Sequence, residues 1–325
     1  MASPRRSWSI VTLLLLGTAC DGAPAPDSSM PPPTDPPTPP AAAPSAPAAP
    51  APPEPQTPPS TTAAEGTLLW DLTWVEAEAV LTPEAVVVLP LGAASKEHGP
   101  HLRLKNDWLL AEYYKERVHQ AADVVIVPTL GFHFYPAFVE YPGSTSLERG
   151  TSRDVVVQIC RGLSRFGPRR FYVLNTGVST VGPLQAAADQ LAAEGILMTF
   201  TDILEIAAPV EQRISEQPGG THADEIETSM MLYIAPETVD MSRAVRDWAP
   251  KTKPGFSRTP DGPGHYSKTG IWGDPTLATR EKGEQVVERM VEGILADIEA
   301  LRVAPLPTPA PTPEPSSSDD ETPPP

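Results

Sequence analysis

Short, unbroken apolar runs that alternate with amphipathic segments constrain the fold of this chain most strongly. The run AVVVLPLG, from Ala85 to Gly92, has the length of one strand and contains no polar residue. Such a run is typical of a parallel strand that is buried on both faces. Further strands are expected at residues 123–131, 169–177 and 196–203, and helices at residues 107–122, 152–166, 182–194, 223–234 and 280–302. This order predicts an α/β fold with a mostly parallel sheet and helices on both of its faces.

Proline divides the chain into a foldable part and two flanks. Residues 31–60 contain fifteen prolines among Ala, Thr and Ser, and such a composition cannot bury enough apolar surface to fold. The stretch 304–325 is similar and contains an acidic patch. We therefore expect a disordered linker over residues 21–65, one α/β domain over residues 66–303, and a Pro-rich acidic disordered tail over residues 304–325.

The charge of the chain argues against nucleic acid as a partner. The formal net charge is −17, whereas a protein that binds a phosphate backbone needs clustered Lys and Arg. The basic run RFGPRR at residues 165–170 fits a solvated turn between a helix and a strand. No nucleic-acid partner is expected.

The first twenty residues predict export. Two arginines precede a short apolar stretch, and small residues then lead to Cys20. This is the pattern of a secretory signal peptide, which is too short for a stable membrane span. The residues before Cys20 resemble a bacterial lipobox, although Gly17 stands where Leu is usual. We expect a lipidated Cys20 that anchors the protein to the bacterial cell envelope, in the periplasm or at the outer membrane, with residues 21–65 as a tether; the alternative is a cleaved, secreted protein.

Polar side chains gather where the expected strands end. Polar segments follow Leu91, Leu130 and Leu174, and another precedes the helix that holds Glu227. In α/β folds, ligands bind outside the carboxyl ends of the parallel strands. These segments are therefore expected to converge on one site.

The first of these segments, KEHGPHLRLKND at residues 96–107, contains two histidines and an aspartate. Neutral imidazole and carboxylate are the ligands of a catalytic divalent metal, which keeps one position open for water. His98, His101 and Asp107 are thus candidates for a metal site. Two alternatives stay open: a surface loop with incidental histidines, and Asp107 as a helix cap.

The second segment is THADEIETSMM at residues 221–231. His222 lies just before the expected helix, and Glu227 lies inside it between Ile226 and an apolar run. Capping explains Asp224 and Glu225, because acidic residues are favourable in a first helical turn. Glu227, in contrast, is expected to face a site rather than solvent.

Four stretches, in order along the chain, resemble the creatininase (creatinine amidohydrolase) family. GAASKEHGPHLRLKND is similar to the family's G-S-x-E-Q-H-G-P-H-L-P-L-x-T-D, and THADEIETSMM to its H-A-G-x-x-E-T-S-x-M-L. YPGSTSL at residues 141–147 and GIWGDPTLATREKGE at residues 270–284 look like two further family motifs. The resemblance implies a three-layer αβα sandwich, a homo-oligomer that is often a hexamer, and one or two divalent metal ions that activate water to open a cyclic or linear amide.

The resemblance also implies roles for single residues. His98 and Asp107 match metal ligands, Glu227 matches a residue that binds metal or handles a proton, and His222 matches a histidine near the substrate. Lys96 stands where the family has its first acidic ligand, and a shift by one position would offer a neighbouring acid, Glu97, instead.

The stretch NTGVST at residues 175–180 departs further from the family. Gly177 stands where the family has a metal-binding histidine, and Ser179 where some members have a glutamate. Neither residue can replace an imidazole at a normal Zn–N distance, so one divalent ion, Zn or Mn, is expected rather than two. His133 is a candidate for the missing imidazole, but an aromatic-flanked histidine that only packs is the simpler alternative. Ser179 or Thr180 is also a candidate nucleophile if His222 acts as its base.

The sequence therefore predicts an exported, metal-dependent amidohydrolase of creatininase type that acts on a small-molecule amide. The residues expected to form its site are, as metal ligands, His98, Asp107, Glu227 and Glu97; in catalysis, His222 and Glu227; and on the substrate side, His101, His133 and Ser179. The alternative is a catalytically inactive creatininase-fold lipoprotein that binds a ligand or a partner at the cell envelope. The glycine at position 177 favours this alternative, and the joint presence of His98, Asp107, His222 and Glu227 favours the enzyme.

Overall fold

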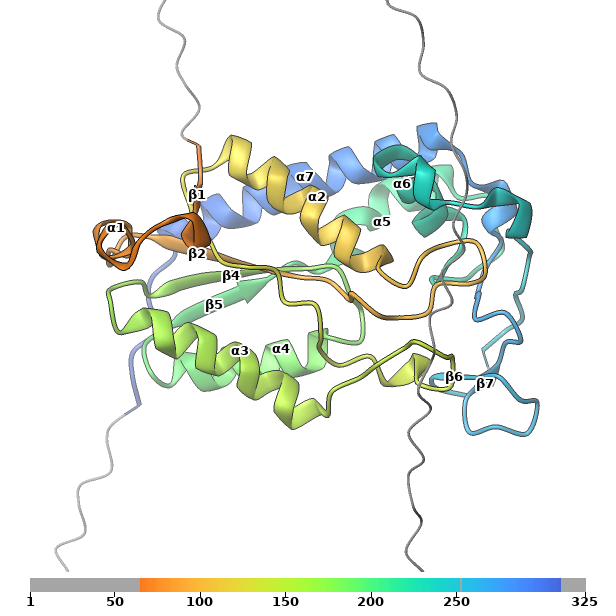
Figure 1. The fold of residues 1–325 in the computed structure, drawn as a ribbon, viewed down its shortest axis with the longest axis horizontal. Helices are drawn as coiled ribbons and strands as arrows, with labels where there is room; N and C mark the ends of the chain where they lie inside the picture. Colours follow the sequence, from red (N-terminus) through yellow and green to blue (C-terminus); the bar gives the residue numbers. More distant parts are fainter. Residues whose placement is uncertain (1–64, 252, 311–325) are drawn as a thin grey trace, which may run out of the picture. The chain divides into compact units, whose positions relative to one another are not determined.

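The computed structural model describes residues 65–251 and 253–310 of the chain (Figure 1). Its main sheet has five strands, all parallel, in the order β1-β3-β2-β4-β5. The strands are β1 (Thr67–Leu68), β2 (Val86–Leu91), β3 (Val125–Ile126), β4 (Arg170–Asn175) and β5 (Leu197–Phe200). The predicted parallel sheet is confirmed, with β1 as an additional edge strand.

Helices cover both faces of the sheet, as Figure 1 shows. One face carries α2 (Asn106–Ala121), α5 (Ile203–Ile214), α6 (Glu225–Ile234) and α7 (Arg280–Val303), and the other carries α3 (Arg149–Ser164) and α4 (Val181–Ala192). A short helix, α1 (Trp74–Val80), precedes β2, and a small second sheet pairs β6 (Phe256–Ser257) with β7 (His265–Tyr266). The fold is the predicted three-layer αβα sandwich.

The apolar strand residues form two cores, because successive side chains of a strand point to opposite faces of the sheet. In β2, Val86 and Val88 belong to the core that α2 and α7 cover, and Val87 and Leu89 belong to the core that α3 and α4 cover. All four residues are buried. Each such side chain contributes roughly 1.5–3 kcal/mol of transfer free energy, so both faces of the strand must be apolar.

The order of the strands directs the loops after β2 and β4 to one site. β2 lies between β3 and β4, so the chain leaves β2 toward one neighbour and returns past it to the other. Ligands bind at such reversals, outside the carboxyl ends of the strands. Gly92, directly after β2, allows a close approach there, because a Cβ atom would lie 2.2 Å from the carbonyl oxygen of Asp107. The start of α2 is therefore packed directly against the end of β2.

Two helices, α1 and α5, are present that the sequence does not predict. α5 contains Pro209 in its interior, and proline inside a helix removes a backbone hydrogen bond, so the sequence pattern gives no helix signal there. α1 exposes 79% of Trp74 and 55% of Val75, so its apolar residues do not form an inward-facing stripe. Both helices exist because their surroundings override the local pattern.

The predicted flanks are only partly described. The signal peptide (1–20), the linker apart from Glu65, and residues 311–325 lie outside the described residues. Residues 304–310, expected in the disordered tail, instead run along the domain, where the N–H of Ala310 donates to the carbonyl oxygen of Ala193 at 2.8 Å. Within the described part of the chain, no helix is long and apolar enough to cross a membrane.

Candidate metal centre

Three side chains from distant parts of the chain converge beyond the carboxyl end of the sheet. His98 lies in the loop after β2, His222 lies just before α6, and Glu227 lies in the first turn of α6. One potential ligand atom from each residue lies within 4.8 Å of the other two. Both histidines are buried, and 23% of the Glu227 side chain is exposed. We call these three residues the metal cluster.

Each ring nitrogen of His98 lies close to a hydrogen-bond acceptor, but a neutral ring can donate to only one of them. Its Nδ1 lies 3.0 Å from the carbonyl oxygen of Lys96, and its Nε2 lies 2.7 Å from Oδ1 of Asp107. Both partners are acceptors, whereas a neutral imidazole has only one N–H. When Nδ1–H donates to the carbonyl group, Nε2 has a lone pair and no proton. That lone pair then faces the carboxylate of Asp107. Nε2 is then available to a cation, and the carboxylate of Asp107 lies beside it.

Glu97 orients His222. Nε2 of His222 lies 3.0 Å from Oε2 of Glu97, and its Nδ1 lies 3.6 Å from Oε2 of Glu227. With Nε2–H donating to Glu97, Nδ1 keeps its lone pair for the metal cluster, as in many metal sites where a carboxylate supports a ligating histidine. Burial alone would raise the pKa of Glu97, but His222 and the N–H of Gly99 lower it overall. Glu97 therefore lies behind His222, which differs from its predicted position as a metal ligand.

A strained turn sets the positions of His222 and Glu227. Ala223 has φ 48°, a left-handed conformation that residues with a side chain rarely adopt, and its N–H donates to Glu227. Asp224 caps α6, since its Oδ1 accepts from the N–H groups of Ile226 and Glu227 at 3.0 Å, which confirms its predicted role. Burial raises the pKa of Glu227 to about 7, so this carboxyl can exchange a proton near neutral pH.

Asp107 is fixed from two sides. Its Oδ1 contacts His98, and its Oδ2 lies 2.6 Å from Nζ of Lys96. Burial alone would raise the pKa of Asp107, but Lys96 and then His98 hold it well below its ordinary value. Burial alone would lower the pKa of Lys96, but Asp107 and the two nearby glutamates raise it overall. The pair is therefore a buried ion pair.

The donor set fits a divalent ion. Two imidazoles and one carboxylate form the three-ligand set of several catalytic zinc sites, which keep a fourth position for water. Asp107 lies beside this set through its contact with His98. When Nδ1–H of His98 donates to Lys96 and Nε2–H of His222 donates to Glu97, each histidine keeps the lone pair of its other ring nitrogen for an ion.

A cavity of about 400 Å³ opens beside the metal cluster, and His222, Glu227 and Lys96 lie in its wall. The ring of Phe138 lies 4.3 Å from that of His222, measured between centroids. The other aromatic and charged residues of the wall are Tyr114, Tyr135, Phe256, Trp272, Lys251, Glu211 and Asp224. Burial raises the pKa of Glu211 to about 7. An apolar cavity with a few polar groups is typical of a site for a small molecule.

Of the predicted substrate-side residues, Ser179 lines this cavity, whereas His101 and His133 do not. His101 is buried, and its Nε2 bonds to the hydroxyl of Thr228 at 2.8 Å. His133 is also buried, and its Nε2 bonds to the carbonyl oxygen of Ser152 at 3.0 Å. Burial lowers the pKa of both histidines to about 4. Both pack as neutral side chains, and His133 does not supply the missing imidazole.

The loop after β4 closes on itself where the family resemblance places a metal-binding histidine. Nδ2 of Asn175 donates to the carbonyl oxygen of Gly177 at 2.7 Å, and the hydroxyl of Thr180 lies 2.7 Å from the same oxygen. Among the residues that the structure describes, no hydrogen bond joins Ser179 to a histidine. The arrangement of a serine nucleophile with its base is therefore not formed.

The sequence does not reveal the aromatic residues that line the cavity, nor the two side-chain pairs Glu97–His222 and Lys96–Asp107. Glu97 and His222 are 125 residues apart, so no local pattern reveals their contact. Lys96 is noticeable in the sequence, because a positive charge stands where the family resemblance places an acid. The sequence does not show that Lys96 is buried and paired with Asp107. Phe138 comes from a short 3-10 helix, Pro136–Phe138, within a long connection, where sequence patterns are weakest.

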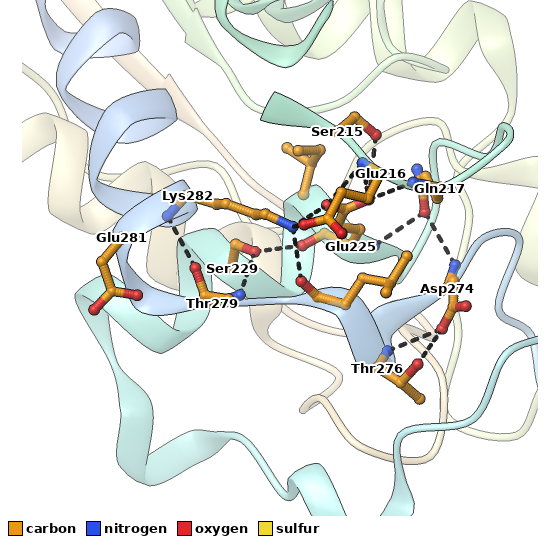
Figure 2. A network of polar contacts seen from close by, with 12 residues as sticks. Ser215, Glu216, Gln217, Glu225, Ser229, Asp274, Thr276, Thr279, Glu281 and Lys282 are labelled. Carbon is orange, nitrogen blue, oxygen red and sulfur yellow. Dashed lines mark hydrogen bonds and ion pairs between the residues drawn. The ribbon is translucent and has the colours of Figure 1, made fainter. Parts of the chain in front are cut away.

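A buried ion pair fixes the segment that leads from α5 to His222, as Figure 2 shows. Glu225 is fully buried, and Nζ of Lys282 on α7 lies 2.5 Å from its Oε1. The N–H groups of Glu216 and Gln217 donate to Oε2 of Glu225 at 2.9 and 2.8 Å. We call these contacts the Glu225 network. They connect α6, α7 and the loop after α5, so Glu225 does more than the simple capping that the sequence suggests.

Comparisons with known proteins identify the family of the chain. The family model named creatininase, creatinine amidohydrolase, matches residues 70–298. The creatinine amidohydrolase of Pseudomonas putida is 30% identical over 250 residues, which are 71% of this chain and 95% of that protein. The mycofactocin precursor peptide peptidase of Mycolicibacterium smegmatis is 28% identical over 215 residues, which are 64% of this chain and 82% of that protein.

Solved structures give the same result. A crystal structure of creatinine amidohydrolase matches with a TM-score of 0.62 and 27% identity, over 75% of this chain and 100% of that chain. A structure described as creatininase Mn matches with a TM-score of 0.60 and 29% identity, over 73% and 99% of the two chains. A mutant creatininase described as Zn-Zn type matches with a TM-score of 0.59 and 27% identity, over 72% and 98%. The chain therefore belongs to the creatininase family.

Proposed function

We propose that this protein is a metal-dependent amidohydrolase that cleaves a C–N bond in a small cyclic or linear amide. The observation that carries the proposal is the convergence of His98, His222 and Glu227, the last two of which line a cavity of about 400 Å³. The names of the relatives support the reaction class, since one is an amidohydrolase of creatinine and the other a peptidase of a precursor peptide.

The residues of the site have separate roles in this reaction. A bound divalent ion supplies a Lewis acid and lowers the pKa of a water molecule. His98, His222 and Glu227 would hold it, and Glu97 keeps the ring of His222 in one orientation. Glu227 takes a proton from the attacking water and delivers it to the amide nitrogen as the C–N bond breaks, through the carboxylate oxygen that does not hold the ion. The products are a carboxylic acid and an amine.

We infer that the site takes one ion, Zn²⁺ or Mn²⁺. His98, His222 and Glu227 are the one group of three or more potential ligands found within residues 65–251 and 253–310. The related structures described as Mn and Zn-Zn forms support both metals.

Removal of the metal is expected to abolish hydrolysis without unfolding the domain. Treatment with a chelator should lower the activity at least about 100-fold, and Zn²⁺ or Mn²⁺ should restore it, because the water loses its activation. The measurements are metal content by mass spectrometry and the hydrolysis of creatinine, other small amides and short peptides. Fewer than about 0.2 ions per chain after growth with both metals, unchanged by His98→Ala, would refute the proposal.

Ligand binding without catalysis is a second candidate function, and one observation favours it. Both carboxylate oxygens of Asp107 are already in contact with protein groups, Lys96 and His98. The cavity would then bind a small molecule or a partner at the cell envelope without a metal. Stoichiometric metal in the wild type that is lost in Asp107→Ala would contradict this candidate.

We also propose that the protein is exported and anchored to a bacterial cell envelope through a lipid on Cys20. The sequence of residues 1–20 and the Pro-rich stretch before the domain support this proposal. Cys20→Ala should move the protein from the membrane fraction to the soluble fraction, and only the wild type should incorporate labelled fatty acid. Recovery of both proteins in the soluble fraction would favour the secreted alternative. The homo-oligomer that the family resemblance implies stays a prediction, which sedimentation can test.

A further inference from the structure

The ammonium group of Lys96 is buried within the negative charge of the site. Its Nζ lies 2.6 Å from Oδ2 of Asp107, and only 5% of the residue is exposed. The same atom lies 4.8 Å from the centre of the Phe138 ring and 5.8 Å from that of Tyr135, and aromatic faces attract cations at such distances. Lys96 also borders the cavity. It is thus a fixed cation beside the metal cluster.

The charges around Lys96 match one divalent ion. Three carboxylates contact Lys96 or a histidine of the metal cluster, namely Asp107, Glu97 and Glu227. When all three carboxylates are ionised, as ligands of an ion are, they and the ammonium group carry a formal charge of about −2, which one divalent ion neutralises. A second divalent ion would leave about +2 in a buried site, and uncompensated buried charge is costly.

We propose that Lys96 is a built-in cation that takes the place of a second metal ion, holding Asp107 and limiting the site to one divalent ion. The inference rests on the proposed function, because it concerns the metal centre of that function. The loop after β4 agrees with it. Gly177 offers no side-chain ligand there, and its carbonyl oxygen already accepts from Asn175.

Two substitutions at Lys96 test the inference by counting bound metal. Lys96→Glu replaces the cation with a carboxylate ligand, so bound Zn²⁺ should rise from about one to about two ions per chain. Lys96→Met removes the charge but keeps most of the volume, so the Kd of the first Zn²⁺ should fall at least about tenfold. Lys96→Arg keeps the charge and should keep one ion. Mass spectrometry gives the count, and titration calorimetry gives the Kd.

Lys282→Met is the matched control. Lys282 is also a lysine with little exposure that pairs with a buried carboxylate, Glu225, at 2.5 Å, but it lies outside the metal cluster. Its replacement should lower the Tm and leave the metal count and the Kd unchanged. The control separates the charge of Lys96 from a general loss of stability.

The outcomes separate this inference from the proposed function. If Lys96→Glu still binds one ion, and the Kd of Lys96→Met stays within about twofold of the wild type, the inference is wrong while the proposed function stands. If the wild type binds no metal, the proposed function fails. In that case, metal binding by Lys96→Glu would still support the inference, and no binding would overturn it. A Lys96→Met protein that folds only with Zn²⁺ present also supports it, because the ion then supplies the missing charge.

Discussion

Glu227→Gln is expected to abolish hydrolysis while the domain stays folded. Glutamine has nearly the same shape and can still accept the N–H of Ala223, but it cannot take up a proton. General acid–base catalysis contributes roughly 10²–10⁴-fold, so kcat should fall at least about 100-fold at saturating metal and substrate. The Tm should not fall, because burial favours a neutral side chain at this position. Steady-state kinetics on the amide found by the hydrolysis screen, and thermal unfolding, are the measurements.

Glu211→Gln is the matched control for this prediction. Glu211 lines the same cavity, and burial raises its pKa to about 7 as well, but it lies outside the metal cluster. Its replacement should change kcat by no more than about threefold. If Glu227→Gln keeps more than about one tenth of the wild-type kcat, Glu227 is not the proton-transfer group. Equal losses in the two variants would assign the effect to the charge of the cavity instead.

The sheet can be predicted from the sequence because its burial leaves a complete pattern. All six residues of β2 are buried, so its sequence VVVLPL contains no polar residue. α5 and α1 leave no such pattern. Pro209 stands inside α5 and Trp74 is exposed on α1, and here contacts made after folding override what the local sequence favours.

The site is predictable only as far as its signals are local. His98, Asp107, His222 and Glu227 each stand in a short polar segment beside a strand or helix, so the sequence points to them. The residue pattern alone does not distinguish His98 from the second histidine, three positions along the chain; only the family resemblance assigns them different roles. The structure separates the two: His98 belongs to the metal cluster, while the second histidine bonds to a threonine that lies 127 residues away in the sequence.

Lys96 shows why burial has to be known before a charge can be interpreted. The sequence shows a lysine where the family resemblance places an acid, and an exposed lysine there would contribute little. Only the structure shows that it is 5% exposed and paired with Asp107 at 2.6 Å. The same residue then bears on how many ions the site can hold.

Glu225→Ala is expected to destabilise the domain strongly, although Glu225 lies outside the metal cluster. Its fully buried carboxylate accepts from Lys282 and from the N–H groups of Glu216 and Gln217 (Figure 2). Loss of one partner of a buried ion pair costs about 3–5 kcal/mol, a large part of the ~5–15 kcal/mol that holds a typical domain together. The free energy of unfolding in a chemical denaturant measures the effect.

Glu216→Ala is the control, because Glu216 pairs with the same lysine but has 66% of its side chain exposed. An exposed pair contributes about 0–1 kcal/mol, so this variant should remain close to the wild type. The double variant Glu225→Ala/Lys282→Met should be less destabilised than the sum of the two single variants, because the second substitution removes the charge that the first leaves unpaired. Losses below about 1 kcal/mol for both acids would contradict the Glu225 network as the connection between α6, α7 and the loop after α5. The segment before His222 would then be held by its backbone bonds to Trp272.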